Sequence, residues 1–145
     1  MADSRDRGQL TLVPIGVVRN ELGRGISPPR ARADRSIIEI DPRLAQGLVG
    51  ISPGQAVVII FAFHQSGPFV ADQHLLQHPE GDPDRPLRGV FSIRSPYRPN
   101  PLGLTTARVL EVEGNRLVVS GLDAFDGTPV MDLKLYTPWV DVPRD

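Results

Sequence analysis

The longest apolar run in this sequence is Ala56-Val57-Val58-Ile59-Ile60-Phe61-Ala62-Phe63, preceded by Gln55. Branched and aromatic side chains of this kind favour strands, and an unbroken run indicates a strand buried on both faces. A turn signal, Ser52-Pro53-Gly54, comes just before it. The run falls far short of the roughly 20 apolar residues of a membrane helix. Residues 55–63 therefore predict a central strand of a water-soluble fold.

Weaker strand signals lie on both sides of this run, each bounded by turn residues. Between two of them, Gly114-Asn115 favours a tight hairpin. Asp41-Pro42 predicts a short helix that ends at Gly47 or Gly50, and residues 20–35 and 64–88 have the composition of long loops. Short strands with almost no helix predict an all-β fold, a small single-domain β-barrel with one or two short helices and long loops. The flanking strands are predicted at residues 12–18, 35–40, 89–93, 105–112, 116–120 and 130–136.

Composition excludes several kinds of site. The 145 residues contain no cysteine, which rules out disulfides and thiolate chemistry. His74 and His78 are spaced for one helix face, but no third ligand accompanies them, so we expect no metal site. The polar start lacks a signal peptide's apolar stretch, which predicts a cytoplasmic protein without membrane contact. No dinucleotide fingerprint, P-loop or nucleophile elbow is present, so a Rossmann-type enzyme is not supported.

Arginine is concentrated near the N-terminus, although the net charge is only −1. Lys134 is the sole lysine of the chain, and guanidinium groups suit phosphates and stack on bases. Either these arginines form a phosphate-facing patch or they lie on an ordinary solvated surface, and clustering alone does not decide between them. The clustered residues are Arg19, Arg24, Arg30, Arg32 and Arg35.

The most unusual segment is Arg94-Ser95-Pro96-Tyr97-Arg98-Pro99-Asn100-Pro101. Its three prolines fix the backbone, and each residue before a proline is held extended. The segment, here called the strap, thus presents guanidinium groups, an amide and an aromatic ring in a preset array that can hold a carboxylate and stack an adenine. A rigid connection between two strands is the alternative. Prolines alone would favour that alternative, and their interleaving with Arg, Asn and Tyr favours a binding site.

Two other segments carry polar side chains at strand ends. Asp126-Gly127-Thr128-Pro129 suits a turn, and beside a binding strap it could offer N–H groups and a carboxylate to a ligand. His64-Gln65 ends the central strand, where ligand contacts are common, although a lone histidine is more often structural.

Four motifs in order resemble the TrmO family, also called the TsaA-like family. They are Ile15-Gly16-Val17-Val18-Arg19, Phe63-His64-Gln65, the run from Gly89 to Leu104, and the run from Gly121 to Tyr136. The resemblance covers roughly residues 12–141, which we expect to form the barrel domain between tails at 1–11 and 142–145. The chain departs from the family pattern at residues 51–56, where members often carry an aromatic-rich segment.

The resemblance implies a homodimeric β-barrel methyltransferase that uses S-adenosylmethionine and methylates N6 of threonylcarbamoyl-adenosine beside the tRNA anticodon. It places cofactor contacts at Pro29, Arg30, His64, Gln65, Arg94, Leu104, Asp126, Gly127 and Thr128. Asp126, and second Asn100, are the candidates to accept the N–H of the methylated amine. Tyr97 or Phe125 could stack on an adenine. Contacts to tRNA are expected from Arg24, Arg30, Arg32 and Arg98, with binding that weakens as salt rises.

Two alternatives remain open from the sequence. The first is an enzyme of the same fold that methylates a small molecule or another RNA. The second is a protein that binds the cofactor or RNA without catalysis.

Overall fold

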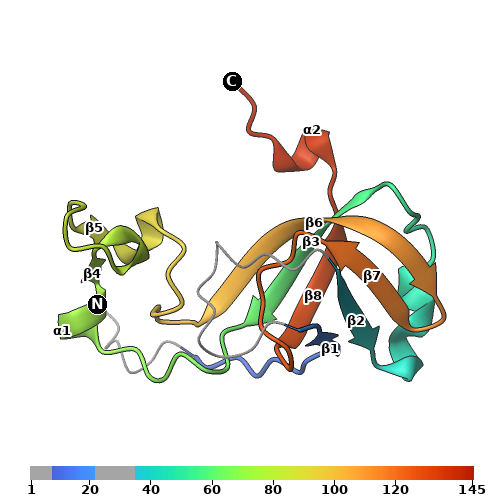
Figure 1. Ribbon diagram of the computed structural model, residues 1–145, viewed down its shortest axis with the longest axis horizontal. Coiled ribbons are helices and arrows are strands. Elements are labelled where there is room, and N and C mark those ends of the chain that lie inside the picture. Colours follow the sequence, from blue (N-terminus) through green and yellow to red (C-terminus); the bar gives the residue numbers. More distant parts are fainter. Residues whose placement is uncertain (1–7, 22–34) are drawn as a thin grey trace.

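The predicted central strand is β3 (Ala56–Ala62), which pairs antiparallel with β6 (Leu102–Glu113) on one side and β8 (Pro129–Leu135) on the other. In the computed structural model, which describes residues 8–21 and 35–145, β3 lies in a closed barrel of strand order β1-β2-β7-β6-β3-β8 (Figure 1). β1 (Gly16–Arg19) closes the barrel against β8, and β2 (Ser36–Ile40) and β7 (Arg116–Ser120) complete it. The predicted all-β barrel is therefore confirmed.

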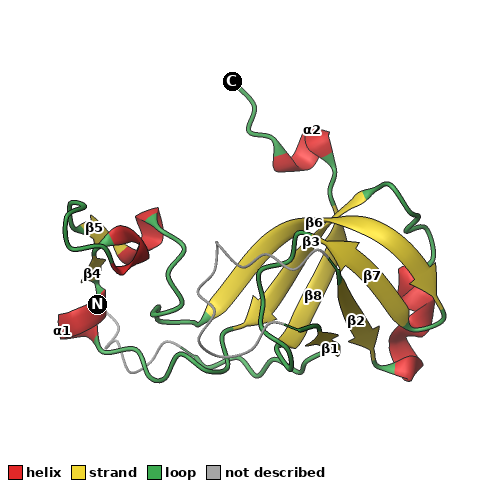
Figure 2. Cartoon of the chain, viewed as in Figure 1, coloured by secondary structure: helices red, strands yellow, loops and turns green. Residues whose placement is uncertain are grey.

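The core fills the barrel with inward-facing branched and aromatic side chains. Along β6, alternate residues from Gly103 to Val109 are buried while those between them are exposed, as expected for a strand with one face inside. Leu117, Val119 and Ile59 are fully buried on the neighbouring strands. In the described part of the chain, helix is confined to short segments outside this sheet (Figure 2).

Several element boundaries differ from the sequence prediction. The strand predicted at 12–18 begins only at Gly16, because β2, its partner, ends at Ile40 and Pro14 has no N–H to pair. The strand predicted at 89–93 is wrong. Only Arg88–Gly89 (β5) pairs as a strand, and Val90–Ser92 (η4) form a 3-10 turn whose Ser92 hydroxyl donates to Gly89 O at 2.7 Å.

The remaining elements lie outside the barrel wall. A helix over Pro42–Leu48 (η2) confirms the prediction from Asp41-Pro42, and it is a 3-10 helix. The long loop at 64–88 contains the short elements α1 (Ala71–His74), β4 (Leu76–Gln77) and η3 (Pro79–Gly81). α2 (Pro138–Asp141) follows the last strand and was not predicted. Among the described residues no helix is long and apolar enough to cross a membrane.

The two ends of the barrel carry different connections. One end of the barrel is here called the ligand rim. Three strands end there (β1, β3 and β7) and the other three begin there (β2, β6 and β8). The register shows this, because Arg19 at the end of β1 pairs with Ile37 near the start of β2, and Ala62 at the end of β3 pairs with Leu102 at the start of β6. The strap, the 121–128 turn, His64-Gln65 after β3 and Asn20 after β1 therefore all belong to this end. The opposite end, the far rim, carries η2, the hairpin at Gly114-Asn115 and the chain beyond β8.

Asp41 caps η2 at the far rim. Its carboxylate accepts from Arg43 N at 3.0 Å and from Arg43 Nη2 at 2.7 Å, and the hydrogen bond from the Arg43 side chain lowers the pKa of Asp41 below its usual value.

We expect Asp41→Ala to lower Tm by a few degrees, because the cap is lost. Asp41→Asn keeps the cap but not the charge. A group with a lowered folded pKa stabilises above its unfolded pKa and loses that effect as pH falls through the folded value. The Asp41→Asn difference from wild type in thermal melts should therefore vanish in acid, and a constant difference would contradict this account.

Candidate ligand site at one rim of the barrel

The strap lies at the ligand rim and leads directly into β6. Arg94 donates from Nη1 to the carbonyl of Leu104 at 3.0 Å, so two of the predicted cofactor contacts are adjacent. Arg94 is exposed, and a guanidinium has five N–H donors, so most of them remain available to a ligand carboxylate. Leu104 points outward from the barrel with 43% of its surface exposed. This arrangement places a cation and an apolar side chain side by side.

Arg98 has a different environment from Arg94. It is half-buried, and its Nη1 donates to the carbonyls of Ile93 and Ser95, both at 3.1 Å. These bonds fold the strap back on itself and hold its shape. A contact between Arg98 and RNA, as predicted, would use only the donors that remain.

A small lobe, residues 71–93, packs against the strap and stands apart from the barrel in Figure 1. The rings of His74 and Tyr97 stack with centroids 4.9 Å apart, and Gln77 Nε2 donates to Tyr97 O at 2.7 Å. One face of Tyr97 is thus covered by the lobe, while the residue as a whole is 42% exposed, which leaves the other face of its ring for a ligand. Neither Gln77 nor His74 was among the predicted site residues. The sequence analysis considered His74 only for its spacing from His78, and Gln77 had no signal beyond its position in a long polar loop.

Backbone hydrogen bonds to β1 hold the 121–128 turn at the ligand rim. Gly127 has φ +84°, a left-handed conformation that favours glycine, and its N–H donates to Val18 O at 2.8 Å. A Cβ at Gly127 would lie 3.9 Å from His64 Nε2, so the predicted residues His64 and Gly127 are neighbours. Thr128 is buried, and its carbonyl accepts from Val18 N at 2.9 Å. Its contribution to a ligand would be indirect, through the turn that it anchors.

Asn20 holds this turn in place and was missed by the sequence analysis. Its backbone N–H donates to Asp126 Oδ1 at 3.0 Å, and its Nδ2 donates to Ala124 O at 2.8 Å and Ser36 Oγ at 3.0 Å. The exposed carboxylate of Asp126 thus has one oxygen directed to the chain and the other left to accept from a ligand. On the inner side, the Asp123 carboxylate accepts the Thr105 hydroxyl and ties the turn to β6.

Gln65 provides the test of whether a polar ligand fits here. Its Oε1 is buried and has no hydrogen-bond partner among the described residues. A buried acceptor without a donor is costly, which is why such groups are nearly always paired. A ligand N–H at this point would satisfy it, and S-adenosylmethionine offers both an ammonium and an adenine amine. The residues present therefore fit this cofactor.

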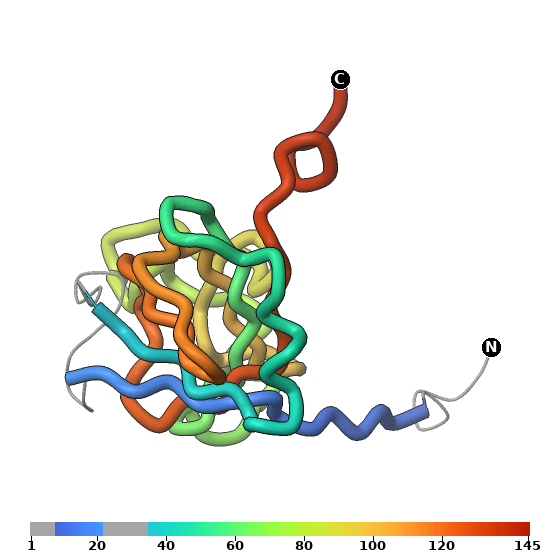
Figure 3. Tube along the Cα trace, turned by 90° about the vertical axis from the view of Figure 1, so that its right-hand side faces the viewer, coloured from blue at the N-terminus to red at the C-terminus, as the bar shows by residue number. Residues whose placement is uncertain are grey.

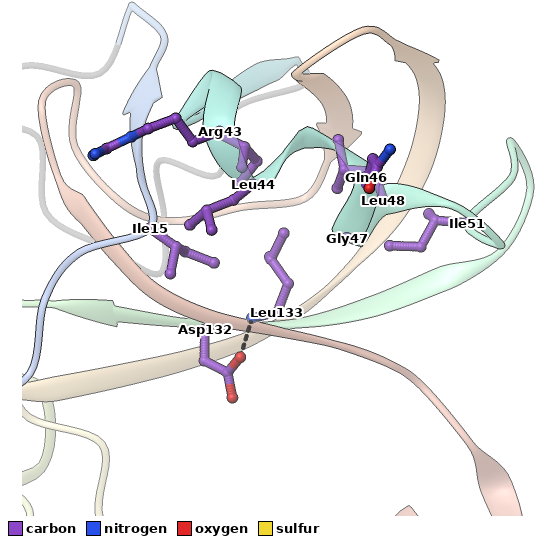
Figure 4. Close-up of a pocket in the computed structure, with 10 residues that line it drawn as sticks. Ile15, Arg43, Leu44, Gln46, Gly47, Leu48, Ile51, Asp132 and Leu133 are labelled. Carbon is purple, nitrogen blue, oxygen red and sulfur yellow. Dashed lines mark hydrogen bonds between the residues drawn. The ribbon is translucent and has the colours of Figure 1, made fainter.

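The predicted site residues divide into two groups, those at the ligand rim and those outside the described residues. His64, Gln65, Arg94, Leu104, Asp126, Gly127 and Thr128 all lie at the ligand rim, with Asn100 and Arg98 in the strap. Arg24, Pro29, Arg30 and Arg32 lie outside the described residues. No group of three metal-ligating side chains gathers within residues 8–21 and 35–145. A cavity of about 400 Å³ lies at the far rim instead, and none of the described site residues lines it (Figure 4).

The fold and this rim define a class: a closed six-stranded antiparallel barrel whose proline strap, strand-end histidine and Asp-Gly-Thr turn meet at one end. The sequence matches the tRNA-methyltransferase O N-terminal domain over residues 19–142. The chain therefore belongs to the TrmO family, as the four sequence motifs predicted.

Relatives of two kinds match the chain. It is 37% identical over 134 residues to a probable S-adenosyl-L-methionine-binding protein of Pyrococcus horikoshii, covering 92% of this chain and 88% of the relative. It is 34% identical to the mouse tRNA (adenine(37)-N6)-methyltransferase, covering 97% of this chain and only 34% of the enzyme. A crystal structure of TrmO superposes with a TM-score of 0.74 at 32% identity, covering 95% of this chain and 62% of that one.

Proposed function

We propose that this protein is an S-adenosylmethionine-dependent methyltransferase that methylates N6 of threonylcarbamoyl-adenosine beside the tRNA anticodon. The observation that carries the proposal is the grouping at one rim of Arg94, Leu104, the neighbours His64 and Gly127, and Gln65 Oε1, which has no partner among the described residues. Family membership and the names of the mammalian relatives support the reaction and its substrate.

The protein's main contribution is binding and alignment. When bound, S-adenosylmethionine supplies a methyl group on a sulfonium, which is already a good leaving group. Arg94 binds the carboxylate of the methionine moiety through donors that do not reach Leu104 O. Gln65 accepts an N–H from the cofactor, and Leu104 covers an apolar part of it. Holding both reactants in line lowers the barrier by removing the entropy cost of their encounter.

Asp126 is the proposed acceptor for the N–H of the adenine amine. The lone pair of that amine is delocalised into the ring, so a carboxylate that accepts its N–H helps to localise the pair on nitrogen. The bond from Asn20 N to Asp126 Oδ1 fixes the carboxylate and leaves Oδ2 for this role. Asn100 in the exposed part of the strap is the second candidate.

The partners we propose are tRNA and a second copy of the chain. The basic residues of the loop after β1 would hold the RNA backbone, with Arg19 at its start and Arg35 at its end. Both are exposed, although each already forms an ion pair, with Glu39 and Glu111 respectively. Exposed pairs of this kind exchange easily for a phosphate, because they contribute little net energy.

A second candidate function is supported by the archaeal relatives. Their names state only S-adenosylmethionine binding, and they are close to this chain in length. The mammalian enzymes are about three times as long as the matched part. A module of this size could bind the cofactor and act on a different methyl acceptor, or on none.

Nucleoside analysis of tRNA distinguishes the two functions. We expect tRNA from a strain lacking this gene to lose the N6-methyl form of threonylcarbamoyl-adenosine and to accumulate the unmethylated form, as measured by mass spectrometry. Restoring the wild-type gene should restore the methyl group completely. Arg94→Ala should fail to restore it, and Arg116→Ala, an exposed arginine at the far rim, should succeed.

Unchanged nucleosides in the deletion strain, together with cofactor binding by the purified protein, would reject the tRNA reaction and favour the second function. If Arg94→Ala and Arg116→Ala both restored the methyl group, the assigned role of the ligand rim would be wrong.

A further inference from the structure

Two oppositely charged side chains on β8, Asp132 and Lys134, have no role in the ligand site described above. Asp132 Oδ2 and Lys134 Nζ are 2.9 Å apart, and the two side chains are 48% and 64% exposed. The chain beyond β8 leads away from the barrel in Figure 1 and in Figure 3, so it does not cover them. An exposed ion pair contributes little to stability. Stability therefore does not account for the pair, and its place in the sheet is the relevant feature.

A β-bulge in β8 turns this pair to the outside of the barrel. The register between β3 and β8 shifts by one residue after Val130, which leaves Met131 without a partner on β3. Val130 is fully buried, so without the bulge the alternation of the strand would place Asp132 inside as well. Instead Leu133 packs against the core, and Figure 4 shows Asp132 directed to the opposite side of β8. Lys134 therefore faces outward too, and bulges that re-aim side chains in this way are frequent next to active sites.

The pair shares a row of the outer barrel wall with Leu104, one of the predicted cofactor contacts. Ile60 of β3 pairs with Leu104 of β6 on one side and with Asp132 of β8 on the other. Directly opposed residues project to the same face of a sheet, and neighbouring strands lie about 4.8 Å apart. Asp132 is therefore roughly 10 Å from Leu104 across the wall. Arg94, which donates to Leu104 O, stands at the other end of this row.

The two side chains offer complementary groups to a ligand. The Asp132 carboxylate accepts Leu133 N at 2.9 Å and pairs with Lys134, so its orientation is fixed from two sides. The hydrogen bond with Asp132 raises the pKa of Lys134, so the ammonium is charged throughout the neutral range. Two of its three N–H donors are left for an anionic group, and the carboxylate keeps lone pairs for a donor. A ligand with a carboxylate beside a hydroxyl suits this pair better than a bare phosphate, which Asp132 would repel.

We propose that this pair recognises the threonylcarbamoyl group of the substrate, with Lys134 binding the threonyl carboxylate and Asp132 accepting the threonyl hydroxyl. The inference rests on the proposed function and assigns the residues that distinguish the modified adenosine from an unmodified one. Lys134 is the only lysine of the chain, and its compact ammonium binds a single carboxylate as a point charge.

The dimensions of the substrate agree with this assignment. By ordinary bond lengths, the carboxylate of an extended threonylcarbamoyl group lies about 5 Å from the adenine N6. The reacting nitrogen lies about 3 Å from the methyl group that it receives. With the cofactor at Arg94 and Leu104, the threonyl group therefore extends along the outer wall and covers most of the roughly 10 Å to Asp132.

The first test compares two substrates that differ only in the carboxylate. Synthetic anticodon stem-loop RNAs carry either threonylcarbamoyl-adenosine or its uncharged carboxamide, and initial rates with S-adenosylmethionine give kcat/KM. Lys134→Met keeps the length of the side chain without its charge, and it should lower kcat/KM on the natural group roughly 10- to 100-fold, as for a lost hydrogen bond to a charged group. Wild type should lose a similar factor on the carboxamide, and Lys134→Met should lose nothing further there. Such coupling identifies a direct contact.

Matched variants separate this contact from other causes. Lys134→Arg keeps the charge and should restore most of the activity, and Arg116→Met removes a cation at the far rim and should leave both rates unaffected. Calorimetric titration with S-adenosylmethionine should give the same affinity for wild type and Lys134→Met, because Lys134 contacts the methyl acceptor and not the cofactor. Unchanged rates in Lys134→Met, or an equal loss on both RNAs, would overturn the inference and leave the proposed function in place. A wild-type protein that does not methylate the threonylcarbamoyl RNA would overturn both.

The second test addresses the hydroxyl. An RNA carrying valylcarbamoyl-adenosine has a methyl group in place of the threonyl hydroxyl and is otherwise of the same shape. Asp132→Ala should lower kcat/KM on the threonyl RNA roughly tenfold more than on the valyl RNA, because only the first loses a hydrogen bond to a charged acceptor. If both RNAs lost the same factor, Asp132 would only orient Lys134 and the assignment of the hydroxyl would be wrong.

Discussion

Arg94→Ala should weaken binding of S-adenosylmethionine by about 1.5–3 kcal/mol, or roughly 10- to 150-fold, in calorimetric titration of the purified protein. The physical reason is the loss of charge-assisted hydrogen bonds to the ligand carboxylate, which are about twice as strong as neutral ones. Arg94 is exposed, and its one hydrogen bond to a described residue goes to Leu104 O. The substitution should therefore leave Tm almost unchanged.

Two matched variants sharpen this measurement. Arg94→Lys keeps the charge but not the planar fork, so its affinity should lie between those of wild type and Arg94→Ala. Arg116→Ala removes the same charge at the far rim and should bind like wild type.

If Arg116→Ala weakened binding as much as Arg94→Ala, net charge and not a specific contact would explain the effect. Binding that persists in Arg94→Ala would place the carboxylate elsewhere. No binding to the unmodified protein would mean that the pocket forms only with RNA, or that this barrel has lost the cofactor.

Gly103→Ala is expected to destabilise the fold by about 1–3 kcal/mol, a large part of the total stability of a small domain. Gly103 faces the barrel interior where β6 leaves the strap. A Cβ at this position would lie 2.9 Å from Phe63 Cζ and closer still to the ring of Phe61. Phe61 is buried and its ring packs edge-on against Phe63 with centroids 5.4 Å apart, so neither ring can move aside freely. Chemical denaturation gives the free energy of unfolding directly.

Gly89→Ala is the control, because a Cβ there would meet open space. It should change the free energy of unfolding by less than about 0.5 kcal/mol. In a Phe61→Leu background the penalty of Gly103→Ala should shrink, because the obstructing ring is absent, and a double-mutant cycle measures that coupling. Equal penalties for Gly89→Ala and Gly103→Ala would show that the loss comes from the backbone and not from the contact with Phe61.

Much of the barrel could be predicted because its signals are local. The branched run of β3, the Gly114-Asn115 hairpin and the Asp41-Pro42 helix start each act within a few residues, and each was confirmed. The strand prediction for residues 89–93 was wrong because the deciding contacts are not local. Their apolar pattern suits a strand, but β4 offers a partner of only two residues, and Val90 instead packs in the lobe.

The residues of the candidate site could be proposed from motifs, but their contacts could not. Nothing near Arg94 in the sequence indicates that it reaches the carbonyl of Leu104, or that Tyr97 stacks on His74 in the lobe. Asn20 was missed because its importance lies in contacts with Ala124 and Asp126, more than 100 residues away. Such contacts depend on strand pairing across the barrel, which periodicity does not reveal.

By itself, then, the sequence determined the all-β class, the position of most strands, and the family with its candidate residues, because side-chain shape, proline and glycine act on the neighbouring backbone. Only the tertiary structure decided that three distant loops meet at one rim, that Gln65 has a buried oxygen with no partner among the described residues, and that a cavity lies between η2 and β8 at the far rim. The physical reason is that barrel closure fixes which strand ends are neighbours. Closure results from the packing of the whole core and from pairings between residues far apart in the chain.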